Sequence, residues 1–175
     1  MERSFLFAII GPDRPGLVEL MSDTVVAHRG NWLDSRMVSL AEHFVGVARV
    51  TIPEDSAQDF ASALQRLEET GLRVMLEPAD KTSSDAPTRK LVIQLMGHDR
   101  PGIVREISRV LHRHGANISE LKTGAEGGPM SGETIFRAVA EIDLPPTLSV
   151  EQLKFDLEAL SHEIMVDLEV DEANS

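Results

Sequence analysis

The sequence predicts an α+β fold in which one β-α-β-β-α-β unit occurs twice. The first observation is a repeated segment: residues 11–18 (GPDRPGLV) return as residues 97–104 (GHDRPGIV), 97 − 11 = 86 positions later, with six of eight positions identical. The second is that each copy follows an apolar run of strand length and precedes an amphipathic stretch. The third is length, because 175 residues suffice for two small domains. A period this long indicates a duplicated domain rather than an array of short repeats.

The first copy contains signals for six elements. Its apolar runs and alternating stretches predict strands, and apolar residues recurring every three or four positions predict helices. Pro15 and Gly16 precede the first helix, Gly30 ends it, and Pro53 ends the third strand. The expected elements are a strand at 5–10, a helix at 17–28, strands at 32–40 and 44–52, a helix at 60–67 and a strand at 72–76.

The second copy repeats this order, and Pro145 and Pro146 end its third strand. The expected elements are a strand at 91–96, a helix at 103–111, strands at 117–123 and 133–142, a helix at 153–160 and a strand at 164–170. The order is that of the split βαβ arrangement. It predicts that each copy is a ferredoxin-like domain, with a four-stranded antiparallel sheet and both helices on one face.

The two copies also predict the domain limits and one insertion. We expect a first domain at 1–79, a linker at 80–88, a second domain at 89–171 and a C-terminal tail at 172–175. Residues 48–53 match residues 140–145 at a displacement of 140 − 48 = 92, so 92 − 86 = 6 extra residues separate the middle strands of the second copy. They fall in the glycine-rich stretch from Gly124 to Gly132, which we expect to be a long hairpin loop that is mobile or contacts a partner.

Composition and charge narrow the classes of function. The net charge is −12, from 29 acidic and 17 basic residues, which argues against direct nucleic-acid binding and against an anionic membrane surface. Because there is no cysteine, we expect no disulfide, no thiolate nucleophile and no cysteine-bound zinc. The N-terminal apolar stretch lacks a cleavage site, and no apolar run is long enough to span a bilayer. We therefore expect a cytoplasmic protein.

No motif indicates catalysis or cofactor binding. Residues 11–16 have the glycine spacing of a phosphate-binding loop but lack the Lys-Ser/Thr pair that follows it. His112 and His114 are two positions apart near a helix end, so they do not share a face and a metal site is disfavoured. No nucleophile has an evident base. We therefore expect no enzyme activity, no cofactor and no bound metal.

The two Asp-Arg-Pro-Gly turns are candidate ligand sites. Each lies where a strand passes to a helix, and the backbone N–H groups of a helix start are free to hold an anion. Turn chemistry alone would explain the aspartate as a cap and the proline and glycine as the bend, but it does not require the arginine. A structural turn and a ligand site both stay open. The candidates are Asp13, Arg14 and Gly16 in the first copy, and His98, Asp99, Arg100 and Gly102 in the second.

Asn31 and Asn117 are further candidates, at the same spacing of 117 − 31 = 86 residues. Each begins the second strand of its copy, and we expect that strand start to lie near the first turn. An asparagine amide offers both a donor and an acceptor. Asp and Asn oxygens would then hold the ammonium group of a zwitterion whose carboxylate meets the helix N–H groups. The alternative is that each asparagine ends the preceding helix in the left-handed conformation.

With these residues considered, the chain resembles a tandem ACT-domain protein over nearly its full length. The resemblance rests on the apolar first strand, the Asp-Arg-Pro-Gly turn and the asparagine that follows it, in both copies. ACT domains are small ligand-sensing modules that pair side by side and bind amino acids at the seam. The resemblance implies that the ligand-facing residues are Asp13, Gly16 and Asn31, and Asp99, Gly102 and Asn117.

Within this superfamily the chain is similar to the glycine cleavage system transcriptional repressor family. The likeness rests on the two-copy length and on residues 30–37 (GNWLDSRM) and 129–137 (PMSGETIFR). Such proteins restrain a DNA-binding activator by contacting it, with glycine shifting the balance. The resemblance implies a DNA-binding transcription activator as partner and glycine or a similar small amino acid as effector. The excess of acidic residues agrees with contact to protein rather than to DNA.

We therefore expect a non-catalytic amino-acid sensor that regulates transcription through protein contact, and we expect it to form homo-oligomers. Two alternatives stay open. One is a detached regulatory subunit of an amino-acid-metabolic enzyme, and the other is a protein-interaction scaffold whose turns are purely structural. Amino-acid binding separates the sensor from the scaffold, and the identity of the captured partner separates the transcriptional regulator from the enzyme subunit.

Overall fold

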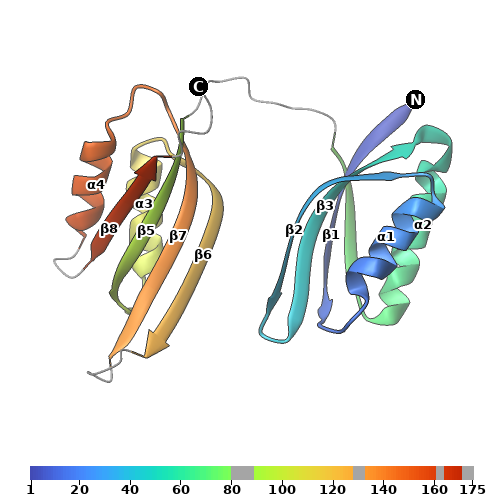
Figure 1. Cartoon of the computed structure of the whole chain (residues 1–175), viewed down its shortest axis with the longest axis horizontal. Coiled ribbons are helices and arrows are strands. Elements are labelled where there is room, and N and C mark those ends of the chain that lie inside the picture. Colours follow the sequence, from blue (N-terminus) through green and yellow to red (C-terminus); the bar gives the residue numbers. More distant parts are fainter. Residues whose placement is uncertain (80–88, 128–132, 161–163, 171–175) are drawn as a thin grey trace. The chain divides into compact units, whose positions relative to one another are not determined.

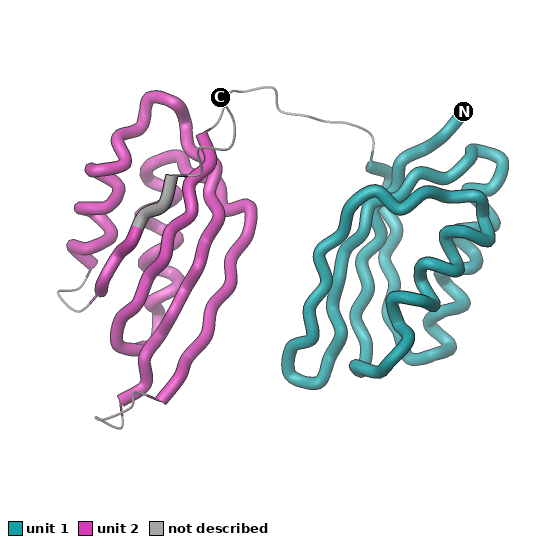
Figure 2. The backbone as a smooth tube through the Cα atoms, viewed as in Figure 1, with its two compact units in different colours: residues 1–83 teal, residues 84–175 magenta. Residues whose placement is uncertain are grey.

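The computed structural model describes residues 1–79, 89–127, 133–160 and 164–170 of the chain. Contacts within the chain divide it into two compact units, residues 1–83 (unit 1) and residues 84–175 (unit 2) (Figure 2). Each unit has its own sheet, its own pair of α-helices and its own apolar core.

Unit 1 is a four-stranded antiparallel sheet with two α-helices on one face (Figure 1). Its elements are β1 (Glu2–Pro12), α1 (Leu17–Ala27), β2 (Asn31–Leu40), β3 (His43–Pro53), α2 (Ala57–Arg66) and β4 (Arg73–Pro78), with short 3-10 helices η1 (Glu54–Ser56) and η2 (Leu67–Thr70) on either side of α2. The strand order is β2-β3-β1-β4, so β1 lies in the interior of the sheet and β2 and β4 form its edges.

Unit 2 repeats this architecture. Its elements are β5 (Arg89–His98), α3 (Ile103–Arg113), β6 (Asn117–Gly127), β7 (Thr134–Leu144), α4 (Val150–Glu158) and β8 (Met165–Val170). The strand order is β6-β7-β5-β8, and every pair is antiparallel. The predicted fold class, two ferredoxin-like α+β domains in tandem, is confirmed.

Alternation along β1 separates the core of unit 1 from the open face of its sheet. Phe7 is fully buried beneath the helices, whereas Leu6 and Ile10 point to the opposite face and are 40% and 43% exposed. The Phe7 ring packs edge-on against Trp32 and Phe60, at centroid distances of 5.6 and 6.5 Å. The only tryptophan of the chain is therefore part of the packing around the core of unit 1.

The middle strands of unit 2 extend further than predicted. Gly124 to Gly127 were expected to begin a loop, but they belong to β6 and pair with β7 in the register Gly124↔Arg137 and Gly127↔Thr134. That half of the loop prediction is wrong, because the ladder uses main-chain groups and glycine can continue it without a side chain. Residues 128–132, the rest of the expected loop, lie outside the described residues.

Two irregular features occur in the β2–β3 hairpin of unit 1. The register shifts between Trp32 and Asp34, which marks a bulge near the start of β2, and β6 has the same shift between Ile118 and Glu120. At the other end of the hairpin, Ala41 and Glu42 form a two-residue turn and both have positive φ, 49° and 62°. This is the left-handed pair of conformations that a tight hairpin of right-twisted strands favours.

Candidate functional site

The first Asp-Arg-Pro-Gly turn connects β1 to α1 and is tied to the β2–β3 hairpin. The main-chain N–H of Asp13 donates to the carbonyl oxygen of Glu42 at 2.9 Å. The Asp13 carboxylate accepts a hydrogen bond from the Ser39 hydroxyl at 2.5 Å. Gly16 then adopts the left-handed conformation, with φ 88°, directly before α1. These contacts fix the turn at the end of the sheet where β1 and β2 finish.

The second turn occupies the same position in unit 2. The main-chain N–H of Asp99 donates to the carbonyl oxygen of Thr134 at 2.8 Å, and Gly102 has φ 89° before α3. His98 lies beside Glu133, with 3.2 Å between Nδ1 and Oε2. These residues, apart from the glycine, line a shallow hollow at this end of the sheet. The turn therefore combines a half-exposed histidine, an aspartate and a glutamate next to a helix start.

The helix that follows each turn begins without a side-chain cap. The residues at the capping position are Gly16 and Gly102, which have no side chain to accept a hydrogen bond from the first N–H groups. The expectation that Asp13 or Asp99 caps the helix is wrong. Each aspartate stands three residues before the capping glycine, whereas the side chain that caps a helix is usually that of the capping residue. The first N–H groups of α1 and α3 donate no hydrogen bond to any described side chain.

The two arginines of the turns have different surroundings. Arg100 donates from Nη1 and Nη2 to the two carboxylate oxygens of Glu106, at 2.9 and 2.5 Å. These hydrogen bonds hold the pKa of the Glu106 carboxyl below its ordinary value. Arg14 is exposed, and it forms neither an ion pair nor a side-chain hydrogen bond with any residue in the described part of the chain.

The asparagines lie at the opposite end of each sheet from the turns. Asn31 pairs with Thr51, which pairs with Ser4 on β1, eight residues before Pro12. At a rise of about 3.3 Å per residue, Asn31 is about 26 Å along the sheet from the first turn.

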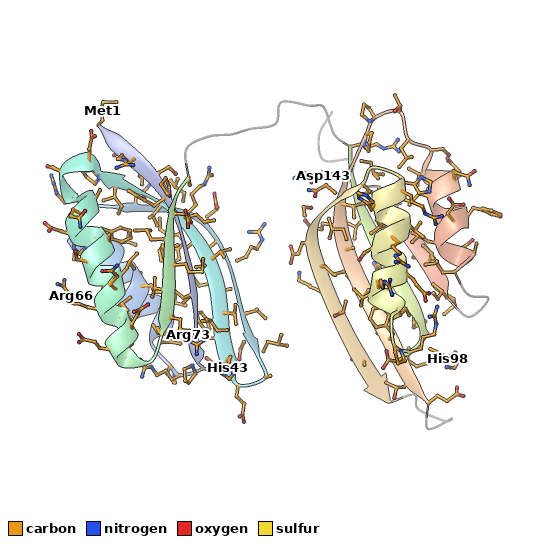
Figure 3. All side chains as sticks on the ribbon, turned by 180° about the vertical axis from the view of Figure 1, so that it is seen from behind. Met1, His43, Arg66, Arg73, His98 and Asp143 are labelled. Atoms are coloured by element: carbon orange, nitrogen blue, oxygen red, sulfur yellow. The ribbon has the colours of Figure 1, made fainter. Side chains whose placement is uncertain are left out.

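Unit 2 has the same layout. Asn117 pairs with Asp143, and Figure 3 shows Asp143 and His98 at opposite ends of the unit. The expectation that each asparagine lies near the turn of its own copy is therefore wrong.

The asparagines do not end the preceding helices in the left-handed conformation either. The left-handed residues at these helix ends are Arg29, with φ 57°, and Gly115, with φ 67°. Asn31 and Asn117 are instead the first residues of β2 and β6, and their side chains are exposed. The alternative that each asparagine ends the preceding helix is therefore also wrong.

Sequence reasoning missed the residues that engage the turns. Ser39 bonds Asp13, Glu106 bonds Arg100, and Glu133 contacts His98. A position-by-position comparison of the two copies carries part of this signal, because Glu106 corresponds to a leucine at 106 − 86 = 20. A charged residue at a position that is apolar in the other copy indicates a local partner.

Two further observations concern other kinds of site. In the described residues, no three histidine, aspartate or glutamate side chains are grouped in a way that could hold a metal ion. None of the helices that the structure describes is both long and apolar enough to pass through a membrane.

Comparison with known proteins shows the family. A sequence model described as "ACT domain" matches residues 3–77 and again residues 89–171. The chain belongs to the ACT domain family. The two matches coincide with the two sheets, so this is a tandem ACT protein, and ACT domains are regulatory domains of the amino-acid-sensing type.

Two curated relatives correspond to about half of this tandem ACT protein. A UPF0237 protein of Methanopyrus kandleri is 34% identical over 80 residues, which are 45% of this chain and 82% of the relative. A UPF0237 protein of Methanococcus maripaludis is 32% identical over 85 residues, 48% of this chain and 88% of the relative. Each match is about the length of one ACT unit.

Solved structures match the tandem ACT chain over nearly its whole length. An unknown protein from Galdieria sulphuraria has a TM-score of 0.84 at 28% identity, covering 97% of this chain and 99% of that one. A protein described as a "putative glycine cleavage system transcriptional repressor" has a TM-score of 0.69 at 14% identity, covering 98% and 99%. The likeness to the second protein shows the fold alone.

Proposed function

We propose that this tandem ACT protein is a non-catalytic amino-acid sensor that regulates transcription by contacting a DNA-binding activator. The observation that carries the proposal is the pair of strand-to-helix turns, each with an uncapped helix start and an aspartate within three residues of it. The proposed effector is glycine or a similar small amino acid, bound at one or both turns. The proposed binding residues of the turns are Asp13, Arg14 and Gly16, and His98, Asp99, Arg100 and Gly102.

The chemistry of the turns suits a zwitterion. Uncapped N–H groups and the positive end of the helix dipole attract a carboxylate. An aspartate carboxylate accepts hydrogen bonds from an ammonium group, and bonds between charged groups are stronger than neutral ones. The left-handed glycine, which has no neighbouring atom within 4 Å of its hypothetical Cβ in either unit, leaves room for a ligand against the main chain.

Asn31 and Asn117 do not contact a ligand at the turn of their own unit, because each lies about 26 Å from that turn. We include a homo-oligomer in the proposal, in which a second copy of the chain can bring an asparagine to a turn. Its test is the molar mass in solution with and without amino acid.

The proposed partner follows from charge and from the comparison. The chain carries a net charge of −12, which disfavours contact with nucleic acid and favours a basic protein surface such as that of a DNA-binding activator. The fold that this chain shares with the protein described as a "putative glycine cleavage system transcriptional repressor" also supports a partner of this kind. This partnership would place the protein in the cytoplasm.

Calorimetry tests the sensor. We expect glycine or serine to release heat on titration into the full chain and to raise the unfolding temperature, with leucine as a bulkier probe. Asp13→Asn should weaken binding at the first turn, and Asp23→Asn, the same change on the exposed face of α1, should leave it unchanged. Absence of heat and of any thermal shift with all three amino acids would remove the sensor.

Capture of the partner tests the regulatory role. The tagged protein, incubated with cell extract with and without glycine, should retain a DNA-binding activator in a glycine-dependent manner. Glycine-independent capture of the activator would favour the scaffold, and retention of an amino-acid-metabolic enzyme would favour the enzyme-subunit function.

A further inference from the structure

The two turns share four identical consecutive residues but present different free side chains. In unit 2 the guanidinium of Arg100 is already paired, and in unit 1 that of Arg14 is not. The difference comes from residues outside the motif, at positions where the two copies have diverged. The inference that follows rests on the proposed function, namely that an amino acid binds at these turns.

Glu106 occupies Arg100 in the way a ligand carboxylate would. It lies in the first turn of α3 and accepts two hydrogen bonds from the two terminal nitrogens of the guanidinium, at 2.9 and 2.5 Å. This two-pronged geometry is the strongest that an arginine forms with a carboxylate. Because Glu106 lies six residues from Arg100 in the same chain, its effective concentration near the guanidinium exceeds that of a dissolved amino acid. An incoming carboxylate must displace it.

Unit 1 lacks this internal carboxylate. The position equivalent to Glu106 is Leu20, whose side chain packs against the core and cannot accept a hydrogen bond. Arg14 is consequently exposed, with no charged or hydrogen-bonding partner among the described residues. Its guanidinium is available beside a helix start whose N–H groups are also uncapped.

The aspartates show the opposite difference. Asp13 accepts a hydrogen bond from Ser39, whereas the residue equivalent to Ser39 is Ala125, at 39 + 86 = 125. The carboxylate of Asp99 therefore has no hydrogen-bond donor among the described side chains. Unit 1 thus presents a free guanidinium beside a fixed aspartate, and unit 2 presents a free aspartate beside an occupied guanidinium. Both units offer uncapped N–H groups to the carboxylate of a zwitterion, and only unit 1 adds a free guanidinium beside them.

We propose that the protein binds one amino-acid carboxylate per chain, at Arg14 and the start of α1, and that Glu106 closes the equivalent site in unit 2. Glu106 is then the residue that determines where the effector binds. Arg14 is the carboxylate-binding residue, and Arg100 belongs to an internal ion pair.

Calorimetric stoichiometry with glycine and serine tests this assignment on the full chain. We expect one site per chain. Arg14→Gln should weaken binding about tenfold or more, because it removes a charged hydrogen bond. Arg3→Gln, the same change near the other end of β1, is the matched control and should leave affinity within about twofold, since Arg3 contacts the ring of Phe5 and not the turn.

The reciprocal variant is Glu106→Leu, which installs the residue of unit 1. It should release Arg100 and create a second site, so the stoichiometry should rise from one to two. Glu106→Ala serves the same purpose if the leucine variant has an altered circular dichroism spectrum.

Two equivalent sites in the native protein, or a single site that survives Arg14→Gln, would overturn the assignment while leaving the sensor intact. A Glu106 variant that folds normally and still binds one amino acid would also overturn it. Absence of binding to the native protein would overturn both the sensor and this assignment.

Discussion

A histidine occupies the same helix-end position in both units, and its contacts differ. His28 and His114 are 86 residues apart. In unit 1 the Nδ1 atom of His28 lies 2.7 Å from the carbonyl oxygen of Thr24. In unit 2 the Nε2 atom of His114 lies 2.8 Å from a carboxylate oxygen of Asp156 and so connects the end of α3 to α4. Both histidines thus reach the second helix of their unit, His28 by packing its ring against Phe60 of α2 at a centroid distance of 5.8 Å and His114 by its contact with Asp156.

The Asp156 link predicts a dependence of stability on pH. The hydrogen bond from His114 and a second from Gln152 hold the pKa of the Asp156 carboxyl below its ordinary value of 3.8. A carboxyl with a lowered pKa in the folded state stabilises that state above the unfolded value, and the stabilisation is lost as pH falls through the folded value. Thermal unfolding should therefore show a smaller loss of stability below about pH 4 in Asp156→Asn than in the native protein.

Asp167→Asn is the control for this experiment, because Asp167 lies exposed on β8 and its side chain forms no hydrogen bond or ion pair with a described residue. It should follow the acid profile of the native protein. Equal acid profiles for the native protein and Asp156→Asn would show that the His114 contact does not stabilise unit 2.

Residue types at the candidate site were predictable, and their partners were not. The turns could be recognised from the sequence because Pro and Gly have strong conformational preferences for turns. The partner of Asp13 comes from another strand, and that of Arg100 from six residues further along the chain. The contact of Ser39 with Asp13 has no sequence signal of its own, and only the difference between Glu106 and Leu20 points to the partner of Arg100. The position of Asn31 was predictable, however. Both β1 and β2 are antiparallel to β3, so they run in the same direction, and β2 starts at the end of the sheet where β1 starts, far from the turn.

At the scale of elements, the passage from the first helix to the second strand is built differently in the two units. Unit 1 uses Arg29-Gly30, and unit 2 uses Gly115-Ala116, so the glycine has moved by one position. The left-handed residue is Arg29 in one unit and Gly115 in the other. Arg29 donates hydrogen bonds to Asp55 and Ser56, at 2.6 and 2.7 Å, which ties the end of α1 to η1, directly before α2.

Gly30 is required by close packing. A Cβ atom at this position would lie 2.3 Å from Cδ1 of Ile52 and 3.0 Å from the main-chain oxygen of Thr51. We expect Gly30→Ala to destabilise unit 1 by about 1–3 kcal/mol, because the strand or the helix must shift to admit the methyl group. Urea unfolding followed by circular dichroism measures this change.

Gly124→Ala is the matched control. A Cβ atom on Gly124 would meet nothing within 4 Å, and its φ is not positive. Its free energy of unfolding should stay within about 0.5 kcal/mol of the native value. If Gly30→Ala were equally neutral, the helix-to-strand passage would be more adaptable than its packing indicates.

The order and type of elements followed from the sequence because each has a strong period and clear breakers. Phe60 and Leu64 recur at helical spacing, and both are buried in α2. Strand limits were less predictable. Gly124 and Gly127 have low strand preference, yet β6 continues through them because β7 supplies a partner for each main-chain group. Pairing with β7 thus sets the end of β6 at Gly127, whereas the local sequence predicted an end at Thr123.

At the scale of the molecule, each unit contains a complete core. The core of unit 1 is centred on Phe7 and Phe60, and that of unit 2 includes Ile93 and Leu153, all fully buried. Among the described residues, none belongs to both cores. The curated relatives, whose matches are about one unit long, agree with a unit that is sufficient as a fold.

Phe7→Ala tests whether the cores are separate in stability as well as in composition. Removing a fully buried phenylalanine should cost unit 1 about 3–5 kcal/mol, a large share of the stability of a small domain. In the amide NMR spectrum of the full chain, the signals of unit 1 should broaden or collapse at a lower urea concentration while those of unit 2 persist.

Ile93→Ala should produce the reverse pattern, at a cost of about 2–5 kcal/mol to unit 2. Simultaneous loss of both sets of signals in either variant would contradict separate cores.

The bulge near the start of β2 and of β6 affects what the outer rim of each sheet can accept. A regular edge strand can pair along its whole length with a strand of another molecule, and such edge-to-edge pairing leads to aggregation. The irregular step at Trp32/Asp34 breaks the spacing of donors and acceptors. A strand from another chain could therefore pair in regular register only with residues Asp34 to Leu40 of β2. In unit 2, regular pairing is possible only from Glu120 onward along β6. The bulge thus shortens the regular part of the β2 edge and of the β6 edge that is open to pairing with another strand.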